Sequence, residues 1–310
     1  MRRLALVLVL FLVVCGVSQA SPQHVSVTLD WTPNPDHVGL FYARETGMFD
    51  KAGLDVAIHA PSDATTPLKL VGVGRTDLAV SYEQEVFFAA AQKLPVTTVA
   101  AVVPVPLNSF MSIDPKVHSL ADLRGRTIGI TGVPSDTATL KTAGLLGRVK
   151  VVSVGYNLLP ALLSHRVDAV LGVYRNVEGI QLAQRGLHPT VIPVDRAGVP
   201  SYDELVLVAN AQRLAKDAAY RDEVSRCVHA FSAGTRAARA HPQQAIAIMQ
   251  KVTASPEKFL AAATPATLKL LTTTCVSPAQ WQRFGAWMQR EGLLKQPVPA
   301  SQVVTAKYCD

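Results

Sequence analysis

The short motifs that mark common enzyme classes are missing from this sequence. Its 310 residues contain no GxSxG, HExxH, P-loop or CxxC pattern, the signatures of serine hydrolases, zinc proteases, nucleotide-binding and thiol-redox proteins. The glycines of residues 72–74 (GVG) are too few for a dinucleotide-binding fingerprint. The eight histidines are scattered, and no two stand at a metal-ligand spacing. Motifs therefore give no ground for a catalytic centre.

Clusters of basic residues and cysteines are also scarce. The formal net charge is +7, but the sequence has no long Lys/Arg run and no interleaving of arginine with aromatics. We therefore expect a mildly basic surface and no nucleic-acid partner. The four cysteines are Cys15, Cys227, Cys275 and Cys309, and their spacing fits no zinc site, so no metal is expected. Two of the last three could pair in an oxidising compartment, and the sequence leaves open which two.

The N-terminus has the plan of a secretory signal peptide over residues 1–20. Two arginines precede an apolar stretch over 4–14, and a small-x-small cleavage site ends at Ala20. This apolar run is too short to span a bilayer comfortably, and no later run is long enough. A lipoprotein anchored through Cys15 is the alternative, but Val14 stands where a small residue is wanted. We expect cleavage after Ala20 and export to the periplasm.

The rest of the chain alternates between strand-like and helix-like patterns. Hydrophobic residues make up 49% and aromatics 6% of the sequence, as in globular α/β proteins. Apolar runs predict a first group of strands at 24–29, 54–59, 77–81 and 96–103. A second group is predicted at 127–131, 149–154, 168–173 and 189–193. Helical patterns separate these strands, and a strand over 202–210 returns to the first group. Residues 212–292 are expected to be helical, with breaks at Pro242, Pro256, Pro265 and Pro278.

This rhythm predicts an α/β fold of two doubly wound lobes joined by a two-strand hinge. Lobe 1 is expected to comprise residues 21–105 and 200–310, and lobe 2 residues 106–199. Because the chain crosses between the lobes twice, we expect a ligand site in the cleft between them. The tail after Pro297 has no periodicity and is expected to be a surface extension.

The stretch over residues 30–47 (DWTPNPDHVGLFYARETG) follows the first predicted strand. Its two prolines force the backbone out of the strand as a fixed loop, and Asp36 is placed to cap the helix that follows. Loops at strand ends are where doubly wound sheets bind ligands. Trp31 and Asn34 are therefore candidate ligand contacts, although a tryptophan here could equally pack in the core.

The same stretch resembles the opening of the thiamine-precursor branch of the periplasmic solute-binding proteins. That branch includes the formylaminopyrimidine-binding proteins and the thiamine pyrimidine synthases. The likeness continues in GRTDLAVSYEQEV (74–86), PLN (106–108), LADLRGRTIGITGVP (120–134), VDAVLGVYRNVE (167–178) and GVPSYDELVLVAN (198–210). It covers nearly the whole chain after residue 20, and DWxPNxxHxG combined with GVPxYxELVLVAN is its most specific part.

The resemblance implies a periplasmic binding protein of type II that acts as the solute-binding component of a bacterial ABC importer. Its ligand would be a thiamine-precursor pyrimidine, of the formylaminopyrimidine or hydroxymethylpyrimidine type. The implied partners are a membrane permease and its ATPase, the protein itself being a monomer without a cofactor. Binding would proceed by closure of the hinge over the ligand.

Six side chains are predicted to contact the ligand: Trp31, Asn34, Tyr82, Asn108, Tyr174 and Glu178. Trp31 and Tyr82 could sandwich a flat heterocycle, with Tyr174 as a further wall. The two asparagines offer a donor and an acceptor together. Glu178 could accept two hydrogen bonds from an aminopyrimidine edge, a role that rests on the family position, and its alternative role is to complement a helix dipole.

Six more residues are predicted to contact the ligand or support the site: Asp30, His37, Glu83, Pro134, Ser135 and Glu204. His37 could cap or orient the loop, and Glu204 could fix the hinge. Glu83 could enter the cleft or merely complement a helix dipole. Pro134 and Ser135 open a predicted helix whose free N–H groups could hold an anionic or carbonyl group.

Two other functions of this family remain as alternatives. A protein for alkanesulfonate, nitrate or taurine needs an anion pocket, whereas Arg175 is the only cation beside these acidic and aromatic candidates. The eukaryotic pyrimidine synthases consume pyridoxal phosphate, and carry a lysine and a histidine four residues apart and a cysteine-rich cluster. Here the corresponding positions are Ser81 and Glu85, and no cysteine lies within 195–205. The sequence therefore predicts a binding protein and not an enzyme.

Overall fold

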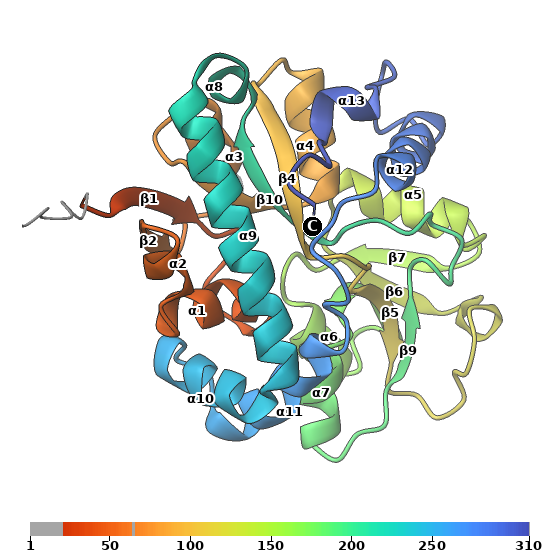
Figure 1. The fold of residues 1–310 in the computed structure, drawn as a ribbon. Helices are drawn as coiled ribbons and strands as arrows, with labels where there is room; N and C mark the ends of the chain where they lie inside the picture. The colour runs from red at the N-terminus through yellow and green to blue at the C-terminus, as the bar shows by residue number, and fades with distance from the viewer. Residues whose placement is uncertain (1–20, 64–65, 310) are drawn as a thin grey trace, which may run out of the picture.

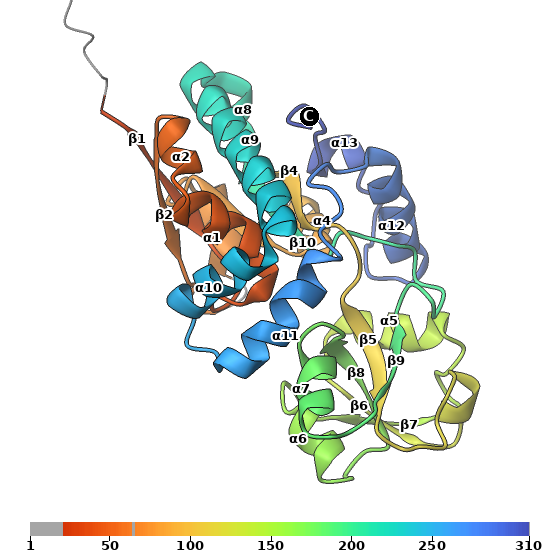
Figure 2. The ribbon, with the colours of Figure 1, turned by 60° about the horizontal axis from the view of Figure 1, so that its bottom comes forward.

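The computed structural model describes residues 21–63 and 66–309, which form two α/β lobes lying side by side (Figures 1 and 2). Each lobe contains one five-stranded sheet, in the orders β2-β1-β3-β10-β4 and β7-β6-β8-β5-β9. The predicted two-lobed α/β fold is thus confirmed. The predicted signal peptide, its cleavage site and Cys15 lie outside the described residues.

The sheet of lobe 1 is assembled from both ends of the chain. Its strands are β1 (Gln23–Thr28), β2 (Leu54–His59), β3 (Leu78–Ser81), β4 (Val96–Val103) and β10 (Leu205–Asn210). β1 runs parallel to β2 and β3, whereas β10 is antiparallel to both of its neighbours, β3 and β4. All six residues of β10 are buried, so the strand that returns from lobe 2 lies inside the sheet of lobe 1.

Helices from the two chain ends cover this sheet. From the first half come η1 (Pro35–His37), α1 (Val38–Glu45), α2 (Met48–Lys51), α3 (Thr66–Gly72) and α4 (Glu83–Ala91). From the C-terminal part come α8 (Ala211–Lys216), α9 (Ala218–Ala240), α10 (Pro242–Val252), α11 (Glu257–Leu268), α12 (Pro278–Arg290) and α13 (Ala300–Val303). α9 packs on α1 through glycine: a Cβ at Gly234 would lie 2.6 Å from the Cβ of Ala43.

Two expectations for the C-terminal part were wrong. Pro265 does not interrupt a helix but lies inside α11. The tail after Pro297 is not a surface extension, because Ala300, Val303 and Val304 are buried and Val304 forms a β-bridge with Thr98. Since β4 is an edge strand, the tail covers backbone groups that would otherwise be exposed at that edge.

Lobe 2 is smaller and uses one continuous stretch of chain. Its strands are β5 (Asn108–Ser112), β6 (Thr127–Ile130), β7 (Lys150–Ser153), β8 (Ala169–Tyr174) and β9 (Thr190–Pro193). Its helices are η2 (Ala121–Leu123), α5 (Pro134–Thr142), α6 (Leu158–Leu163) and α7 (Glu178–Gln184). β5 runs antiparallel to both of its neighbours, β8 and β9, whereas β6 runs parallel to β7 and β8. The strands thus fall on either side of the predicted boundaries near 105 and 200, which stay a prediction.

Two features are absent from the residues that the structure describes. Among them, no helix combines the length and the apolar character needed to cross a bilayer. Within the same residues, no group of three or more His, Cys, Asp and Glu side chains could hold a metal ion.

Candidate functional site

Predicted site residues from both lobes meet where strands of the two sheets end. Asp30 follows β1, Tyr82 follows β3 and Tyr174 ends β8. The Tyr82 hydroxyl donates to Asp30 Oδ2 at 2.9 Å. Burial raises the pKa of Tyr174 well above its ordinary value, and the nearby charges of Glu204, Tyr82 and Asp30 raise it further. Because these charges act on Tyr174, the side chains named here from lobe 1 and lobe 2 form one acidic, aromatic region.

The loop after β1 is held by a buried histidine. His37 is 0% exposed, and its Nε2 lies 2.7 Å from Asp30 Oδ1. Its Nδ1 accepts the backbone N–H of Asn34 at 3.3 Å, so the ring proton is on Nε2 and is donated to the carboxylate of Asp30. His37 therefore orients the loop and Asp30, which is one of the two roles expected for it.

Asn34 has a different local task from the one expected. Its Oδ1 accepts from Asp36 N at 2.8 Å and its Nδ2 donates to the carbonyl of Thr32 at 3.1 Å. Asn34, rather than Asp36, is thus the N-cap of η1, because its side chain reaches back over the Pro35 turn. A direct contact of Asn34 with ligand could use its second amide hydrogen or its second lone pair, and it stays a prediction.

Trp31 has a ring partner that sequence reasoning missed. Its side chain is 50% exposed, and its ring centroid lies 6.4 Å from that of Tyr156, which is 80% exposed. Trp31 belongs to the loop after β1, whereas Tyr156 lies between β7 and α6 of lobe 2. The two rings therefore approach each other across the lobes. Tyr156 carries no motif, and only the folded arrangement reveals it.

Asn176 joins the lobes at another point. Its Nδ2 donates to Asp36 Oδ1 at 2.6 Å and to Thr267 Oγ1 at 2.8 Å, both in lobe 1. Asn176 is 3% exposed, and its Oδ1 has no hydrogen-bond partner in the described part of the chain. α7 begins at Glu178, which leaves Asn176 in a turn that faces lobe 1.

Asp36 is an unusual carboxyl because it is nearly fully buried. It is 2% exposed, and burial raises its pKa to about 7, while His37 and Asn176 act in the opposite direction. Asp30 and Glu204 add a further increase. Sequence reasoning treated Asp36 only as a helix cap. The sequence signal that could have marked Asp36 as a buried acid is its position between Pro35 and a run of apolar residues.

Glu204 fixes the hinge. Its Oε2 accepts the backbone N–H groups of Leu107 at 2.7 Å and Asn108 at 3.1 Å, and the Tyr202 hydroxyl at 3.1 Å. Its Oε1 accepts the Tyr174 hydroxyl at 3.1 Å. Glu204 therefore ties both crossings to the end of β8, and the lone-pair sites it has left for a ligand are few.

Asn108 and Glu178 each keep one polar group without a partner among the described residues. Asn108 Oδ1 accepts from Gly172 N at 3.1 Å, which leaves its Nδ2. Glu178 Oε2 accepts from Tyr174 N at 2.7 Å, which leaves Oε1. Burial raises the pKa of Glu178, and the hydrogen bonds from backbone N–H groups lower it. Both residues are thus oriented by the protein and still able to bond a ligand.

The remaining predicted residues have internal partners nearby. Glu83 is 0% exposed, and its Oε2 accepts the backbone N–H of Asp203 at 2.7 Å, so it braces the second crossing. Pro134 and Ser135 begin α5, but the carboxylate of Asp136 already accepts from Gly132 N at 2.8 Å. That carboxylate stands where an anionic ligand at this helix would have to bind.

Sequence comparison identifies the family. Residues 34–245 match the family described as NMT1/THI5 like. A protein of Haemophilus influenzae named for thiamine biosynthesis is 36% identical over 229 residues, which cover 72% of this chain and 71% of the relative. The formylaminopyrimidine-binding protein of Halalkalibacterium halodurans is 39% identical over 237 residues, covering 73% and 69%.

More distant relatives include enzymes. The 4-amino-5-hydroxymethyl-2-methylpyrimidine phosphate synthase THI11 of Saccharomyces cerevisiae is 26% identical over 159 residues, covering 49% of this chain and 47% of the enzyme. The relatives that match over most of the chain are named for binding or thiamine biosynthesis, and the enzymes match over half. The comparison therefore supports a binding role.

Solved structures support the fold. The periplasmic aliphatic sulphonate binding protein SsuA of Escherichia coli superposes with a TM-score of 0.72 at 16% identity, covering 92% of each chain. The ligand-binding component of an ABC-type import system of Staphylococcus aureus gives 0.70 at 14% identity, covering 92% and 97%. At such identities the likeness concerns the fold alone. The chain belongs to the NMT1/THI5-like family and has the two-lobed fold of the periplasmic binding proteins.

Proposed function

We propose that this protein is the solute-binding component of an ABC importer and binds a thiamine-precursor pyrimidine between its lobes. The ligand would be of the formylaminopyrimidine or hydroxymethylpyrimidine type. One observation carries the proposal: Asp30, Glu178 and Glu204 gather with tyrosines at strand ends of both lobes. The 39% identity to a formylaminopyrimidine-binding protein supports the same ligand class.

The groups in this region suit a flat, amino-bearing ring. The exposed face of Trp31 and the ring of Tyr156 offer apolar stacking surfaces on opposite lobes. Glu178 Oε1 is an acceptor for an amino group, and Asn108 Nδ2 is a donor for a ring nitrogen. Tyr82, first expected to stack opposite Trp31, bonds Asp30 through its hydroxyl and would form a wall of the site.

An anionic ligand fits this region poorly. Alkanesulfonate, nitrate and taurine require cationic or N–H-rich pockets, whereas the side chains that meet here are carboxylic acids and phenols. Burial of Glu178 next to an anion would add repulsion to its cost of desolvation. Arg175, the nearest cation in sequence, lines a groove on lobe 2. The likeness to sulfonate-binding proteins is thus one of fold.

The side chains that a pyrimidine synthase would need are not present at the corresponding positions, Ser81 and Glu85. Ser81 ends β3 with 2% exposure, and Glu85 lies in the first turn of α4. A Schiff base to pyridoxal phosphate needs an amine at such a position, and neither side chain provides one. The protein is therefore a binding protein, and we expect no aldimine that borohydride could trap on a lysine.

Closure of the lobes is the proposed mechanism. The lobes touch on one side through Asn176, Asp36 and Thr267, and on the other through the Trp287 indole N–H, which donates to Thr142 Oγ1 at 2.9 Å. A ligand that bridges the lobes favours this arrangement over an open one. The closed protein, a monomer in the periplasm, would present the ligand to a permease and ATPase. Mass spectrometry of the exported protein should find Ser21 at the N-terminus.

The decisive experiment replaces Glu178. Glu178→Gln keeps the side-chain size but exchanges one acceptor oxygen for a donor, so a pyrimidine amino group loses its charge-assisted partner. Affinity for a formylaminopyrimidine should fall by about 1.5–3 kcal/mol, roughly ten- to a hundredfold. Isothermal titration calorimetry measures this directly.

Glu257→Gln is the matched control, because Glu257 is also an acid in the first turn of a helix but is exposed on α11. It should leave the affinity unchanged. The same titrations with an alkanesulfonate test the rival ligand. Sulfonate binding tighter than pyrimidine binding, together with no loss in Glu178→Gln, would reject the proposed function.

A further inference from the structure

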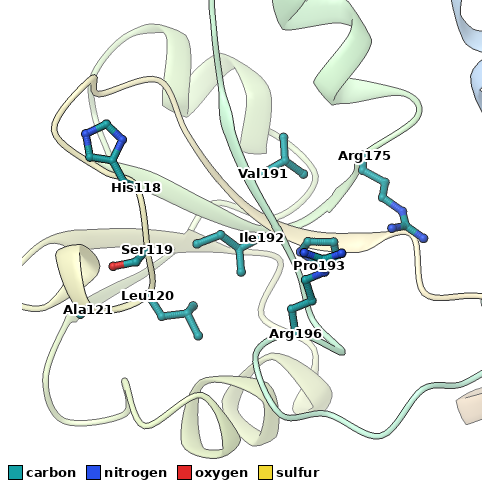
Figure 3. Close-up of a pocket in the computed structure, with 9 residues that line it drawn as sticks. All are labelled: His118, Ser119, Leu120, Ala121, Arg175, Val191, Ile192, Pro193 and Arg196. Atoms are coloured by element: carbon teal, nitrogen blue, oxygen red, sulfur yellow. The ribbon is translucent and has the colours of Figure 1, made fainter.

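A groove on lobe 2 lies apart from the predicted ligand contacts. It has a volume of about 650 Å³ and is formed by residues 118–121, by the end of β9 and by two arginines, Arg175 and Arg196. Figure 3 shows the two arginines at one end of the groove and His118 toward the other. None of the twelve residues predicted for the interlobe site lines it.

Protein groups leave both guanidinium groups unpaired in the described part of the chain. Neither guanidinium forms a hydrogen bond or ion pair with any residue within 21–63 or 66–309. The Nε of Arg175 is buried and has no partner at all in that part of the chain. A buried N–H without an acceptor is costly, and native proteins usually satisfy such donors with protein, water or ligand.

Nearby carboxylates are occupied by backbone groups. Asp122 accepts the N–H of His118 at 3.0 Å and that of Ser119 at 2.9 Å. Asp195 Oδ1 accepts the backbone N–H of Arg196 at 3.0 Å rather than pairing with its guanidinium. The acids on these segments thus shape the loops and leave the two cations to face the groove.

The opposite wall of the groove is apolar. Leu120, Ile192 and Pro193 contribute side chains there, and Figure 3 shows Leu120 and Ile192 between the arginines and His118. Two guanidinium groups beside such a wall suit a ligand with a tetrahedral oxyanion at one end and a small apolar body at the other.

We propose that this groove is a second ligand site, which takes a small organic phosphate ester. Arg175 and Arg196 bind the phosphate, and the ester group lies against Leu120 and Ile192. The segments that carry the arginines are both bonded to the first interlobe crossing: Arg175 N donates to Leu107 O, and Val194 N to Asn108 O, each at 3.1 Å. The site does not depend on which solute the interlobe cleft binds.

Phenyl phosphate is the first probe, with inorganic phosphate and phenol as its two halves. Calorimetry should show saturable binding of phenyl phosphate, weaker binding of inorganic phosphate and no saturable binding of phenol. In Arg196→Gln the affinity for phenyl phosphate should fall about tenfold, since one charge-assisted contact is lost. Arg196 is exposed, so the variant should fold normally.

Arg166→Gln is the matched control, because Arg166 is an exposed arginine of the same lobe outside the groove. It should leave binding unchanged. In amide NMR spectra, phenyl phosphate should shift the signals of Ser119, Ala121, Ile192 and Arg196. Absence of saturable binding, an equal loss in both variants, or shifts confined to the start of α5 would each overturn the proposal.

Discussion

The two lobes have the same α/β architecture but differ in how deeply some of their strands are buried. In lobe 1, every residue of β3 and β10 is buried, and the side chains of Trp281, Trp287 and Phe87 are inaccessible or nearly so. In lobe 2, β7 and β9 contain no fully buried residue. The interior strands of lobe 1 are therefore fully covered, whereas the edge strands of the lobe 2 sheet are only partly covered.

Acids of the two lobes include carboxyl groups in opposite environments. Burial raises the pKa of Asp36 to about 7 and that of Asp203 to about 6 in lobe 1. In lobe 2, hydrogen bonds from backbone N–H groups hold the pKa values of Asp114 and Asp122 below their ordinary range. Aspartates thus contribute to stability with opposite dependence on pH, according to whether they are buried or bonded by backbone N–H groups nearer the surface.

The largest effect should come from truncating the sheet core of lobe 1. Leu207 in β10 is 0% exposed, so Leu207→Ala should lower the free energy of unfolding by about 2–5 kcal/mol. Val151→Ala in β7, where the side chain is 39% exposed, should cost less than about 0.5 kcal/mol. Urea unfolding of both variants measures the difference. Equal losses would remove the contrast between the lobes.

Replacement of the buried carboxyl group of Asp36 should give the next largest effect, on how the free energy of unfolding depends on pH. Because the pKa of Asp36 is raised from 3.8 to about 7 in the folded protein, the folded state holds a proton that the unfolded chain releases. The free energy of unfolding should therefore fall as pH rises from 4 to 7, by on the order of 1 kcal/mol per pH unit. Asp36→Asn, which keeps an acceptor for Asn176, should flatten this slope in urea unfolding series.

Asp122 supplies the opposite control. Its lowered pKa means that its contribution is present at neutral pH and is lost as pH falls through the lowered value. The difference between wild type and Asp122→Asn should therefore shrink only in strong acid. If the free energy of unfolding of wild type and of Asp36→Asn changed in parallel between pH 4 and 7, Asp36 would not be the group that causes the slope. The charges of His37, Asp30 and Glu204 also act on Asp36.

The bridge between the lobes should give a smaller change, in binding. Asn176→Ala removes the donor shared by Asp36 and Thr267, so closure becomes less favourable and the pyrimidine should bind about tenfold more weakly. Gln184→Ala removes a hydrogen bond to Lys258 O that also joins the lobes but is exposed, and should change the affinity by less than about twofold. Similar losses in calorimetric titrations of the two variants would mean that burial of the bridge does not matter.

The smallest effect should come from the rings at the mouth of the cleft. Tyr156→Ala removes the partner of Trp31 and should weaken pyrimidine binding about three- to tenfold. Tyr156→Phe keeps the ring and should bind as the wild type does. Because Tyr156 is 80% exposed, thermal unfolding should be unchanged in both. Weaker binding in Tyr156→Phe would assign the role to the hydroxyl instead.

Much of the fold was predictable because strands follow local apolar patterns. The runs at 54–59 and 96–103 coincide with β2 and β4. β5 was not predicted, since NSFMS has no alternation that sets it apart from its neighbours. The position of β10 between β3 and β4 depends on partners distant in sequence, which local periodicity does not encode.

For the candidate site, too, local patterns were predictable and contacts between distant residues were not. Asp30, Tyr82 and Tyr174 could be predicted to lie near one another because strand ends are visible in sequence. Asn176 and Tyr156 were missed because their partners lie 140 and about 125 residues away in the chain and no short motif marks such pairs. The N-cap is Asn34 and not Asp36 because the turn at Pro35 places the cap two residues earlier than the helical pattern suggests.

The place of β10 also bears on the order in which the protein can fold. Lobe 2 is complete within one uninterrupted stretch of chain, so it can form as soon as that stretch is available. Lobe 1 begins earlier, but its sheet has a gap between β3 and β4 until Leu205–Asn210 arrives. The N-terminal lobe is thus started first and finished last, and its open strand edges need protection during that interval.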